Sequence, residues 1–147
     1  MRKVFLGGTI NGSKWRDLII PHFKIDYFNP VVAEWSDEAY KQELKERENC
    51  DYCLYVLTPK MTGVYAIAEV VDDSNKRPEK TIFCILVQDE KEEFDEFQVK
   101  SLIAVGKMIR KNGARWFASL EEVIDFLNSD IETSDESISK KILSWFK

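Results

Sequence analysis

Short apolar runs alternate along this chain with segments whose apolar residues recur at helical spacing. The expected strands are brief, and the later ones are almost wholly apolar, as is typical of strands buried on both faces: residues 4–6, 23–28, 52–57, 81–87 and 115–117. Helical patterns fall between and after them, at residues 14–20, 36–48, 64–75, 94–111 and 119–127. This alternation predicts an α/β domain whose sheet is mostly parallel.

Right-handed crossovers make a flavodoxin-like, doubly wound five-stranded sheet the default arrangement for such a chain. The 147 residues are enough for one domain, which we expect to span residues 1–128. Residues 88–93 read as an acidic loop within it. Residues 129–147 read as a polar linker and a short amphipathic helix, which is either a mobile end or an arm that packs on a neighbouring subunit.

Charge and cysteine usage narrow the class of protein. The net charge of −5 argues against a nucleic-acid binder, which usually carries a basic patch. No apolar run is long enough for a membrane span, and the short apolar N-terminus reads as a strand rather than a signal peptide, so we expect a cytoplasmic protein without a membrane partner. Cys50 and Cys53 form one C-x-x-C pair, but the only histidine is His22. We therefore expect buried reduced thiols, no metal and no cofactor.

A ligand of such a sheet binds beyond the carboxyl ends of the strands, where the strand order reverses. The loops that follow Leu6 and Leu57 meet there. The first loop offers glycines for a close backbone approach and polar side chains as donors: Gly7, Gly8, Gly12, Thr9, Asn11 and Ser13. It lacks the dinucleotide-binding spacing, so an ordinary strand-to-helix turn is the alternative.

Two acids on neighbouring helices are candidates for chemistry. Glu69 lies in the second turn of the helix that follows Leu57, and it shares a face with Tyr65. The expected packing stripe of that helix is another face, formed by Val64, Ile67, Ala68 and Val71. Glu43 lies four residues before Arg47, on a helix whose inner side we expect to be Ala39, Tyr40 and Leu44. The alternative for Glu69 is a solvated glutamate on the helix surface, and the alternative for Glu43 is a surface ion pair with Arg47.

Several segments together resemble one known family. They are the segment Val4 to Gly12, Glu43 with Asp51 eight residues later, and the Pro59 turn leading to Glu69. In this order and spacing, over about residues 2–127, the chain resembles the nucleoside 2-deoxyribosyltransferases and their nucleotide N-glycosidase relatives. A branch found in phages and bacteria is similar in three further places: Trp15-Arg16, Asn29-Pro30 and Trp35.

The resemblance implies a flavodoxin-like fold and cleavage of the bond between a base and a 2-deoxyribose. It implies that Glu69 is the nucleophile and that Glu43 is an acid assisting at the base or sugar. It also implies that Phe5 is the first-strand aromatic and that the sugar or 5-phosphate is held by Gly7, Gly8, Thr9 and Asn11. From the residues themselves, we expect Tyr65 to orient Glu69 and tryptophan rings to stack on the base. The remaining substrate-binding candidates are Trp15, Trp35, Asn29 and Gly63.

Three functions therefore stay open. The first is an enzyme that cleaves or exchanges N-glycosidic bonds of nucleosides or nucleotides through a covalent glutamyl intermediate. The second is cleavage of a nicotinamide dinucleotide, because Toll/interleukin-receptor-like domains share this architecture and use a helix glutamate. The third is a nucleotide-binding module without turnover. We also expect a homo-oligomer, most simply a dimer, since the resemblance implies sites built partly from a neighbouring subunit.

Overall fold

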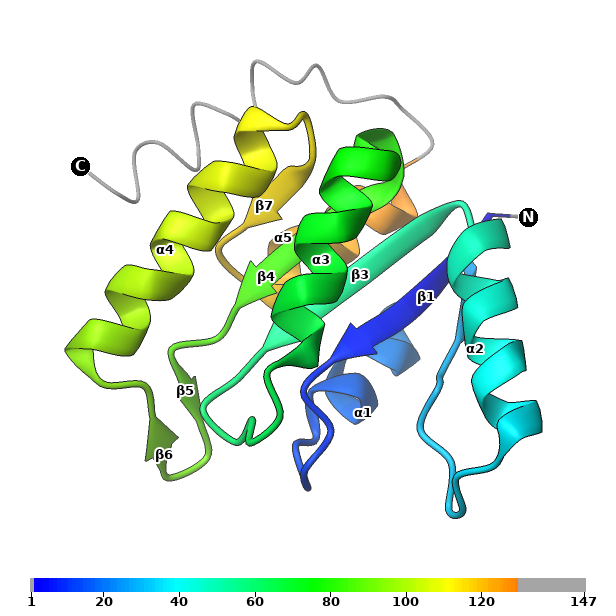
Figure 1. Cartoon of the computed structure of the whole chain (residues 1–147), viewed down its shortest axis with the longest axis horizontal. Coiled ribbons are helices and arrows are strands. Elements are labelled where there is room, and N and C mark those ends of the chain that lie inside the picture. Colours follow the sequence, from blue (N-terminus) through cyan, green and yellow to red (C-terminus); the bar gives the residue numbers. More distant parts are fainter. Residues whose placement is uncertain (1, 130–147) are drawn as a thin grey trace.

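A computed structural model describes residues 2–129, which form a parallel β-sheet between two layers of helices (Figure 1). Within these residues the main sheet has five strands in the order β2-β1-β3-β4-β7, and every neighbouring pair is parallel. The strands are β1 (Lys3–Gly8), β2 (Asp26–Phe28), β3 (Tyr52–Leu57), β4 (Thr81–Ile85) and β7 (Arg115–Phe117). The predicted flavodoxin-like sheet is confirmed, and its order reverses between β1 and β3.

Helices cover both faces of the sheet. On one face lie α2 (Asp37–Asn49), α3 (Tyr65–Lys76) and α4 (Glu96–Lys111), and on the other lie α1 (Trp15–Ile19) and α5 (Leu120–Asn128) (Figure 1). Short 3-10 turns follow α1 (Ile20–His22) and α3 (Pro78–Lys80). Serine side chains cap the N-termini of two helices, because the hydroxyls of Ser36 and Ser119 accept hydrogen bonds from backbone amides of the first turns of α2 and α5.

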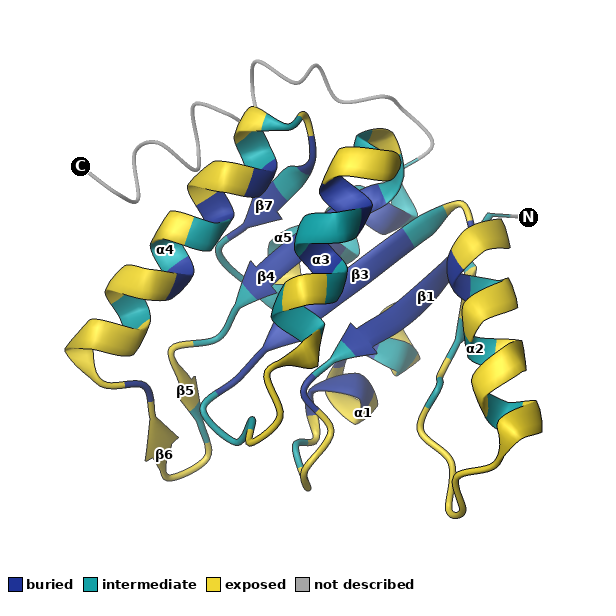
Figure 2. Ribbon diagram, in the orientation of Figure 1, coloured by how far each residue is buried: buried dark blue, intermediate teal, exposed yellow. Residues whose placement is uncertain are grey.

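The core lies on both faces of the central strands. Val4, Phe5 and Leu6 of β1 are at most 1% exposed. The same holds for residues 53–57 of β3 and residues 82–84 of β4, while the outward faces of the helices carry most of the exposed residues (Figure 2). Burial on both faces explains why these strands are apolar throughout instead of alternating.

Residues 88–93 are not a plain loop. They form a small antiparallel hairpin, β5 (Gln88–Asp89) and β6 (Glu92–Glu93), whose turn includes Glu90 at φ 54°. The apolar pattern gave no sign of this hairpin, because its strands consist of polar residues that contribute little to the core. The predicted strand at residues 23–28 is also shorter, since only Asp26–Phe28 pair with β1.

The inward faces of two helices differ from those predicted. Of the stripe expected on α3, Ile67 and Val71 pack against the core, but Val64 just before the helix is 67% exposed, and the fully buried apolar residue is Val70. On α2, Tyr40 and Leu44 are 46% and 42% exposed, whereas Arg47 is buried. The inner side of α2 is therefore charged, and apolar spacing alone gave the wrong face.

The remaining predictions concern cysteines, membranes and the C-terminal segment. Cys50, Cys53 and Cys84 are buried and unpaired. Over residues 2–129, no helix is long and apolar enough to cross a bilayer. The linker and amphipathic helix were expected at residues 129–147, and residues 130–147 lie outside the described part of the chain.

Candidate active site

The loop after β1 is locked against the neighbouring strand β3. Gly8 has φ +112°, and a Cβ placed there would lie 2.1 Å from the carbonyl oxygen of Val56. The amide of Thr9 donates to that same carbonyl at 2.9 Å, and the Thr9 hydroxyl accepts from the amide of Thr58 at 3.0 Å. Glycine at position 8 is therefore required by the close approach of β3 and by its backbone angle.

A buried arginine fixes the shape of this loop from the other side. Arg16 is 5% exposed, and its guanidinium donates to the carbonyls of Leu6 at 3.0 Å and of Thr9 at 2.7 Å. It also lies over the Trp15 ring, 4.3 Å from the centroid, and the Trp15 indole N–H donates to Thr9 as well. Burial lowers the pKa of Arg16 to about 10. The pair therefore shapes the loop, and Trp15 is a core residue of this corner.

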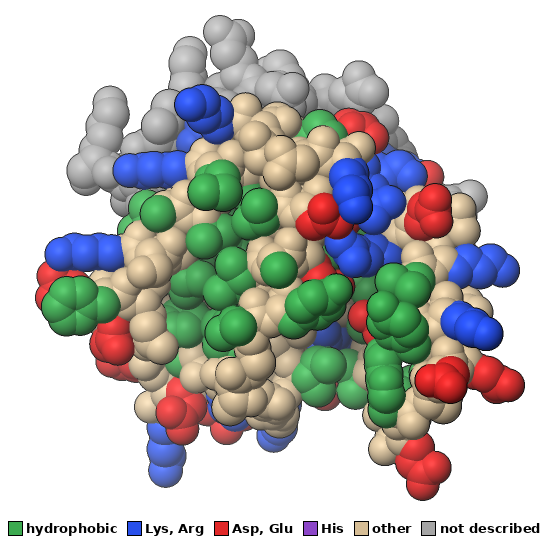
Figure 3. Space-filling model, viewed as in Figure 1, with side chains coloured by type: hydrophobic (Ala, Val, Ile, Leu, Met, Phe, Trp, Pro, Cys, Tyr) green, Lys and Arg blue, Asp and Glu red, His purple; other side chains and the backbone are tan. Residues whose placement is uncertain are grey.

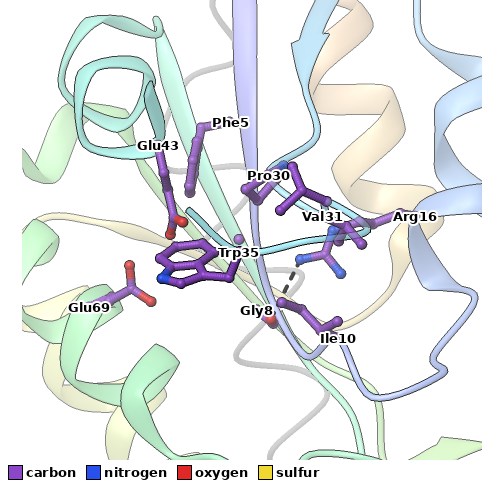
Figure 4. A pocket seen from close by; sticks show the side chains of 11 residues that line it. Phe5, Gly8, Ile10, Arg16, Pro30, Val31, Trp35, Glu43 and Glu69 are labelled. Atoms are coloured by element: carbon purple, nitrogen blue, oxygen red, sulfur yellow. Dashed lines mark hydrogen bonds between the residues drawn. The ribbon is translucent and has the colours of Figure 1, made fainter. Parts of the chain in front are cut away.

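A pocket of about 130 Å³ opens beside this loop, at the carboxyl end of β1. It is bounded by the loop after β1, by the segment between β2 and α2, and by one face each of α2 and α3 (Figure 4). The residues that line it are Phe5, Gly7, Gly8, Ile10, Arg16, Pro30, Val31, Val32, Trp35, Glu43 and Glu69. The position agrees with the edge at which ligands of doubly wound sheets bind.

Two carboxyl groups point into this pocket from different helices. Glu43 reaches it from α2 and Glu69 from α3, and the Trp35 ring lies beside both (Figure 4). Burial raises the pKa of Glu69 to about 7, against the opposing charge of Arg47, while the neighbouring Glu43 raises it further. Burial also raises the pKa of Glu43, against Arg47 and Arg16. Two carboxyl groups whose pKa values are both raised by burial, in one pocket, suit proton transfer and nucleophilic attack.

The two aromatic residues of the pocket, Trp35 and Phe5, differ in how far they are exposed. Trp35 is 63% exposed and meets Tyr40 edge-on at 5.8 Å, so one face of its ring is available to a planar ligand. Phe5 is 1% exposed and stacks on Phe28 at 5.9 Å. Phe5 therefore forms the apolar floor, while Trp35 lies at the open side.

Six of the twelve predicted site residues come together in the pocket, and six lie outside its lining. The six that line it are Phe5, Gly7, Gly8, Trp35, Glu43 and Glu69, and the six that do not are Thr9, Asn11, Trp15, Asn29, Gly63 and Tyr65.

Several residues outside the lining shape its loops. Asn11 donates to the Thr62 hydroxyl at 2.5 Å, and the Asn29 side chain accepts from the amide of Val31 at 3.1 Å. Gly63 and Tyr65 are exposed around the start of α3, where the Tyr65 side chain is 68% exposed.

Sequence reasoning did not single out five of the lining residues as ligand contacts: Ile10, Arg16, Pro30, Val31 and Val32. The Asn29-Pro30 turn was the available signal for three of them, because it ends β2 and sends the following residues over the pocket. Ile10, Val31 and Val32 are 52%, 42% and 47% exposed, and exposed apolar residues gathered around a pocket are typical of a ligand site.

One carboxylate ties the hairpin to both loops of the site. Asp89 of β5 accepts from the Ser13 hydroxyl at 2.5 Å and from the Thr58 hydroxyl at 2.7 Å. Ser13 belongs to the loop after β1, and Thr58 begins the loop after β3. The loops that follow β1, β3 and β4 are therefore joined at a single side chain.

No group of three or more His, Cys, Asp or Glu side chains within residues 2–129 is arranged to hold a metal ion. Cys50 and Cys53 have different neighbours, since the Cys50 thiol lies against Glu46 and the Cys53 thiol donates to the carbonyl of Arg47. Burial raises the pKa of each thiol to about 12, which favours the protonated, unreactive form.

Comparison with known proteins agrees with this geometry. No curated protein is similar enough to the chain to count as a match. The family described as nucleoside 2-deoxyribosyltransferase like matches residues 1–88, a segment that contains every residue of the pocket. This match covers more than half of the chain, and the chain therefore belongs to the nucleoside 2-deoxyribosyltransferase-like family.

Proposed function

We propose that this protein cleaves or exchanges the N-glycosidic bond of 2-deoxynucleosides or their monophosphates, with Glu69 as nucleophile and Glu43 as general acid. The observation that carries the proposal is the pair of carboxyl groups that point into one pocket from α2 and α3 (Figure 4). Family membership supports a nucleoside as the ligand.

In the first step, the C1–N bond breaks and its electron pair leaves with the base. Glu43 gives its proton to the departing base, and a carboxylate oxygen of Glu69 bonds to C1. Burial raises the pKa of Glu43, which favours its protonated form and supports its role as a proton donor. Positive charge that develops on the sugar favours the ionised form of Glu69 as the transition state is approached.

In the second step, the glycosyl ester on Glu69 is resolved. Water, or the nitrogen of a second base, attacks C1 and gives its proton to the Glu43 carboxylate, while the Glu69 carboxylate leaves. Both enzyme groups return to their starting states. Water as acceptor gives hydrolysis, and a base gives transfer.

The pocket walls suggest where the substrate parts lie. The open face of Trp35 suits the flat base, and Val31 and Val32 add apolar surface to the lining of the pocket. The loop at Gly7 and Gly8, supported by the buried cation of Arg16, suits the sugar or its 5-phosphate.

Release of free base from a panel of compounds tests this proposal. The panel contains deoxynucleosides, their 5-monophosphates and NAD, each with and without a second base as acceptor. We expect free base from a 2-deoxy compound. Nicotinamide released from NAD alone would instead support the dinucleotide-cleaving alternative, and tight binding without any release would support a binding module.

Variants assign the two acids. We expect Glu69→Gln to lose turnover by several powers of ten, because the two-step path depends on its carboxylate. Glu93→Gln is the matched control, since it removes the same charge from an exposed residue of β6 outside the pocket. Mass spectrometry of rapidly quenched enzyme should find the deoxyribosyl adduct on Glu69. An adduct on Glu43 would reverse the two roles.

We also propose that the chain forms a homo-oligomer. Apolar side chains gather on the face between α3 and α4 (Figure 3). The exposed large apolar residues of α3, α4 and the segments before them include Val64, Tyr65, Val87, Phe97 and Met108, each more than 50% exposed. A second copy would bury this face and cover Tyr65. Light scattering tests the proposal, because a mass near 17.2 kDa means a monomer and removes it.

A further inference from the structure

The inner side of α2 carries an arginine that is held in place by a buried acid. Arg47 is 8% exposed, and its guanidinium donates through Nε and Nη2 to the two oxygens of Asp73, at 3.1 and 2.9 Å. Nη2 also lies 3.4 Å from a carboxylate oxygen of Asp72 and from the carbonyl oxygen of Glu69. Two bonds to one planar carboxylate fix the orientation of the guanidinium.

The carboxylate of Asp73 is itself fixed by three side chains, those of Arg47, Tyr55 and Arg77. Its side chain is completely buried, it accepts a hydrogen bond from the Tyr55 hydroxyl, and Arg77 donates to it through Nε and Nη2 at 3.0 and 2.9 Å. Two guanidinium groups thus share one buried carboxylate. The buried charge of Asp73 alone cannot balance both cations, so Arg47 also attracts the two other acids beside it, Asp72 and Glu69.

The remaining terminal nitrogen of the Arg47 guanidinium faces Glu69. Its Nη1 lies 3.6 Å from Oε2 of Glu69, whose side chain is 14% exposed. Arg77 follows the C-terminal end of α3. It also binds Asp73, and it therefore differs from Arg47 in lying beyond the end of the helix that carries Glu69. Arg47 is therefore the cation that connects the buried acid with the carboxyl group of the pocket.

We propose that Arg47, held by Asp73, is a positioning residue that favours the ionised form of the Glu69 carboxylate and keeps it turned toward the substrate; this inference rests on the function proposed above. A nucleophilic carboxylate must carry its charge, and burial opposes that charge. A fixed cation on the protein side of Glu69 supplies the opposing effect without occupying the substrate side.

All the charged neighbours of Glu69 agree with this assignment. Burial raises its pKa to about 7, and the facing acids Glu43 of α2 and Asp73 of α3 raise it as well. Arg47 is the neighbour that lowers it. Without Arg47, every remaining influence would favour the protonated, non-nucleophilic form.

Carbon-13 NMR titration of the glutamate carboxyl groups tests the coupling without requiring activity. The Glu69 signal is assigned by its disappearance in Glu69→Gln. We expect Arg47→Gln to raise the midpoint of Glu69 by about one pH unit or more, as loss of an opposite charge at this distance predicts. Arg77→Gln is the matched control, because it also removes one guanidinium from Asp73, and it should move the midpoint far less. Equal shifts in both variants would overturn the proposal.

A second measurement covers the case in which Arg47→Gln does not fold. In the wild-type protein, nitrogen-15 signals of the Arg47 guanidinium should follow the titration of Glu69. In Glu69→Gln that transition should vanish, while the Arg47 Nε–H stays protected by Asp73. Guanidinium signals that ignore the titration of Glu69 would overturn the proposal.

Kinetics then separate this inference from the proposed function. The acidic limb of the pH–rate profile should move to higher pH in Arg47→Gln, with much of the rate recovered as pH rises, and should stay in place in Arg77→Gln. A rate lost equally at every pH would show a structural role only. If the wild-type protein releases no base from any compound of the panel, the proposed function fails, and the NMR shifts still decide whether Arg47 governs Glu69.

Discussion

The burial of Glu69 should make the stability of the protein depend on pH in a way that one substitution removes. Its pKa is raised from 4.5 to about 7 in the folded state. Between these two values the folded state binds more protons than the unfolded state, so the free energy of unfolding falls as pH rises through this window. Glu69→Gln is neutral at every pH and should lack that fall.

The size of the effect follows from the shift. A difference of about 2.5 pH units corresponds to about 3 kcal/mol at 1.36 kcal/mol per unit. The pocket is open on one side, and solvent screening there reduces the figure to about 2 kcal/mol. Glu69→Gln should therefore gain about 2 kcal/mol over the wild type between pH 4.5 and pH 8, which is about 4–8 °C in Tm for a domain of this size.

Urea denaturation at several pH values from 4.5 to 8 measures this difference. Glu93→Gln is the matched control, because it removes the same charge from an exposed position on β6. We expect the curve of Glu93→Gln to run parallel to that of the wild type. If the curve of Glu69→Gln also runs parallel to that of the wild type, burial does not raise the pKa of Glu69, and the electrostatic account of the site is wrong.

Four further substitutions have distinct expected outcomes. Glu43→Gln should lower kcat by about 10²–10⁴-fold, with less loss for bases that leave easily, as kinetics on a series of bases would show. Trp35→Ala should raise KM by about tenfold or more while leaving Tm nearly unchanged, since the ring is 63% exposed. Trp15→Phe should instead lower stability by about 2 kcal/mol, measured by urea denaturation, because a buried hydrogen bond and part of a buried ring are lost. Gly8→Ala should cost about 3 kcal/mol or more in the same assay, because its Cβ would meet Val56.

The strands and helix ends could be predicted because local chemistry decides them. The strand Tyr52–Leu57 was predicted with its observed bounds, since an apolar run of six residues ends at the Thr58-Pro59 turn. The side-chain caps at Ser36 and Ser119 also depend only on neighbours within three residues.

The faces of α2 and α3 depend instead on what each helix meets across space. Arg47 is buried because Asp73, far along the chain, is buried opposite to it. An apolar pattern gives no sign of such a pairing, so the prediction placed Tyr40 and Leu44 inward.

In the candidate site, too, some residues could be predicted from the sequence, whereas others depend on contacts across space. Glu43 and Glu69 could be predicted because the resemblance to the family assigns roles to acids at these two positions, and the loop before Glu69 leaves the expected edge of the sheet. Thr9 and Asn11 were also expected to reach the ligand, but their side chains bond to the loop after β3. A donor in a loop can face either a ligand or a neighbouring loop, and only the folded arrangement decides between them.

The two hydrogen bonds that Asp89 accepts from Ser13 and Thr58 couple the hairpin to the site, so the hairpin can report on ligand binding from outside the pocket. Residues 88–93 lie outside the pocket, yet they are bonded through one side chain to the two loops that border the switch point of the sheet. A ligand that stiffens the loop after β1 should slow the opening of the hairpin, and amide hydrogen exchange at residues 88–93 would register occupancy from a distance. A fluorophore attached at the tip of the hairpin could then follow binding while every residue of the pocket stays intact.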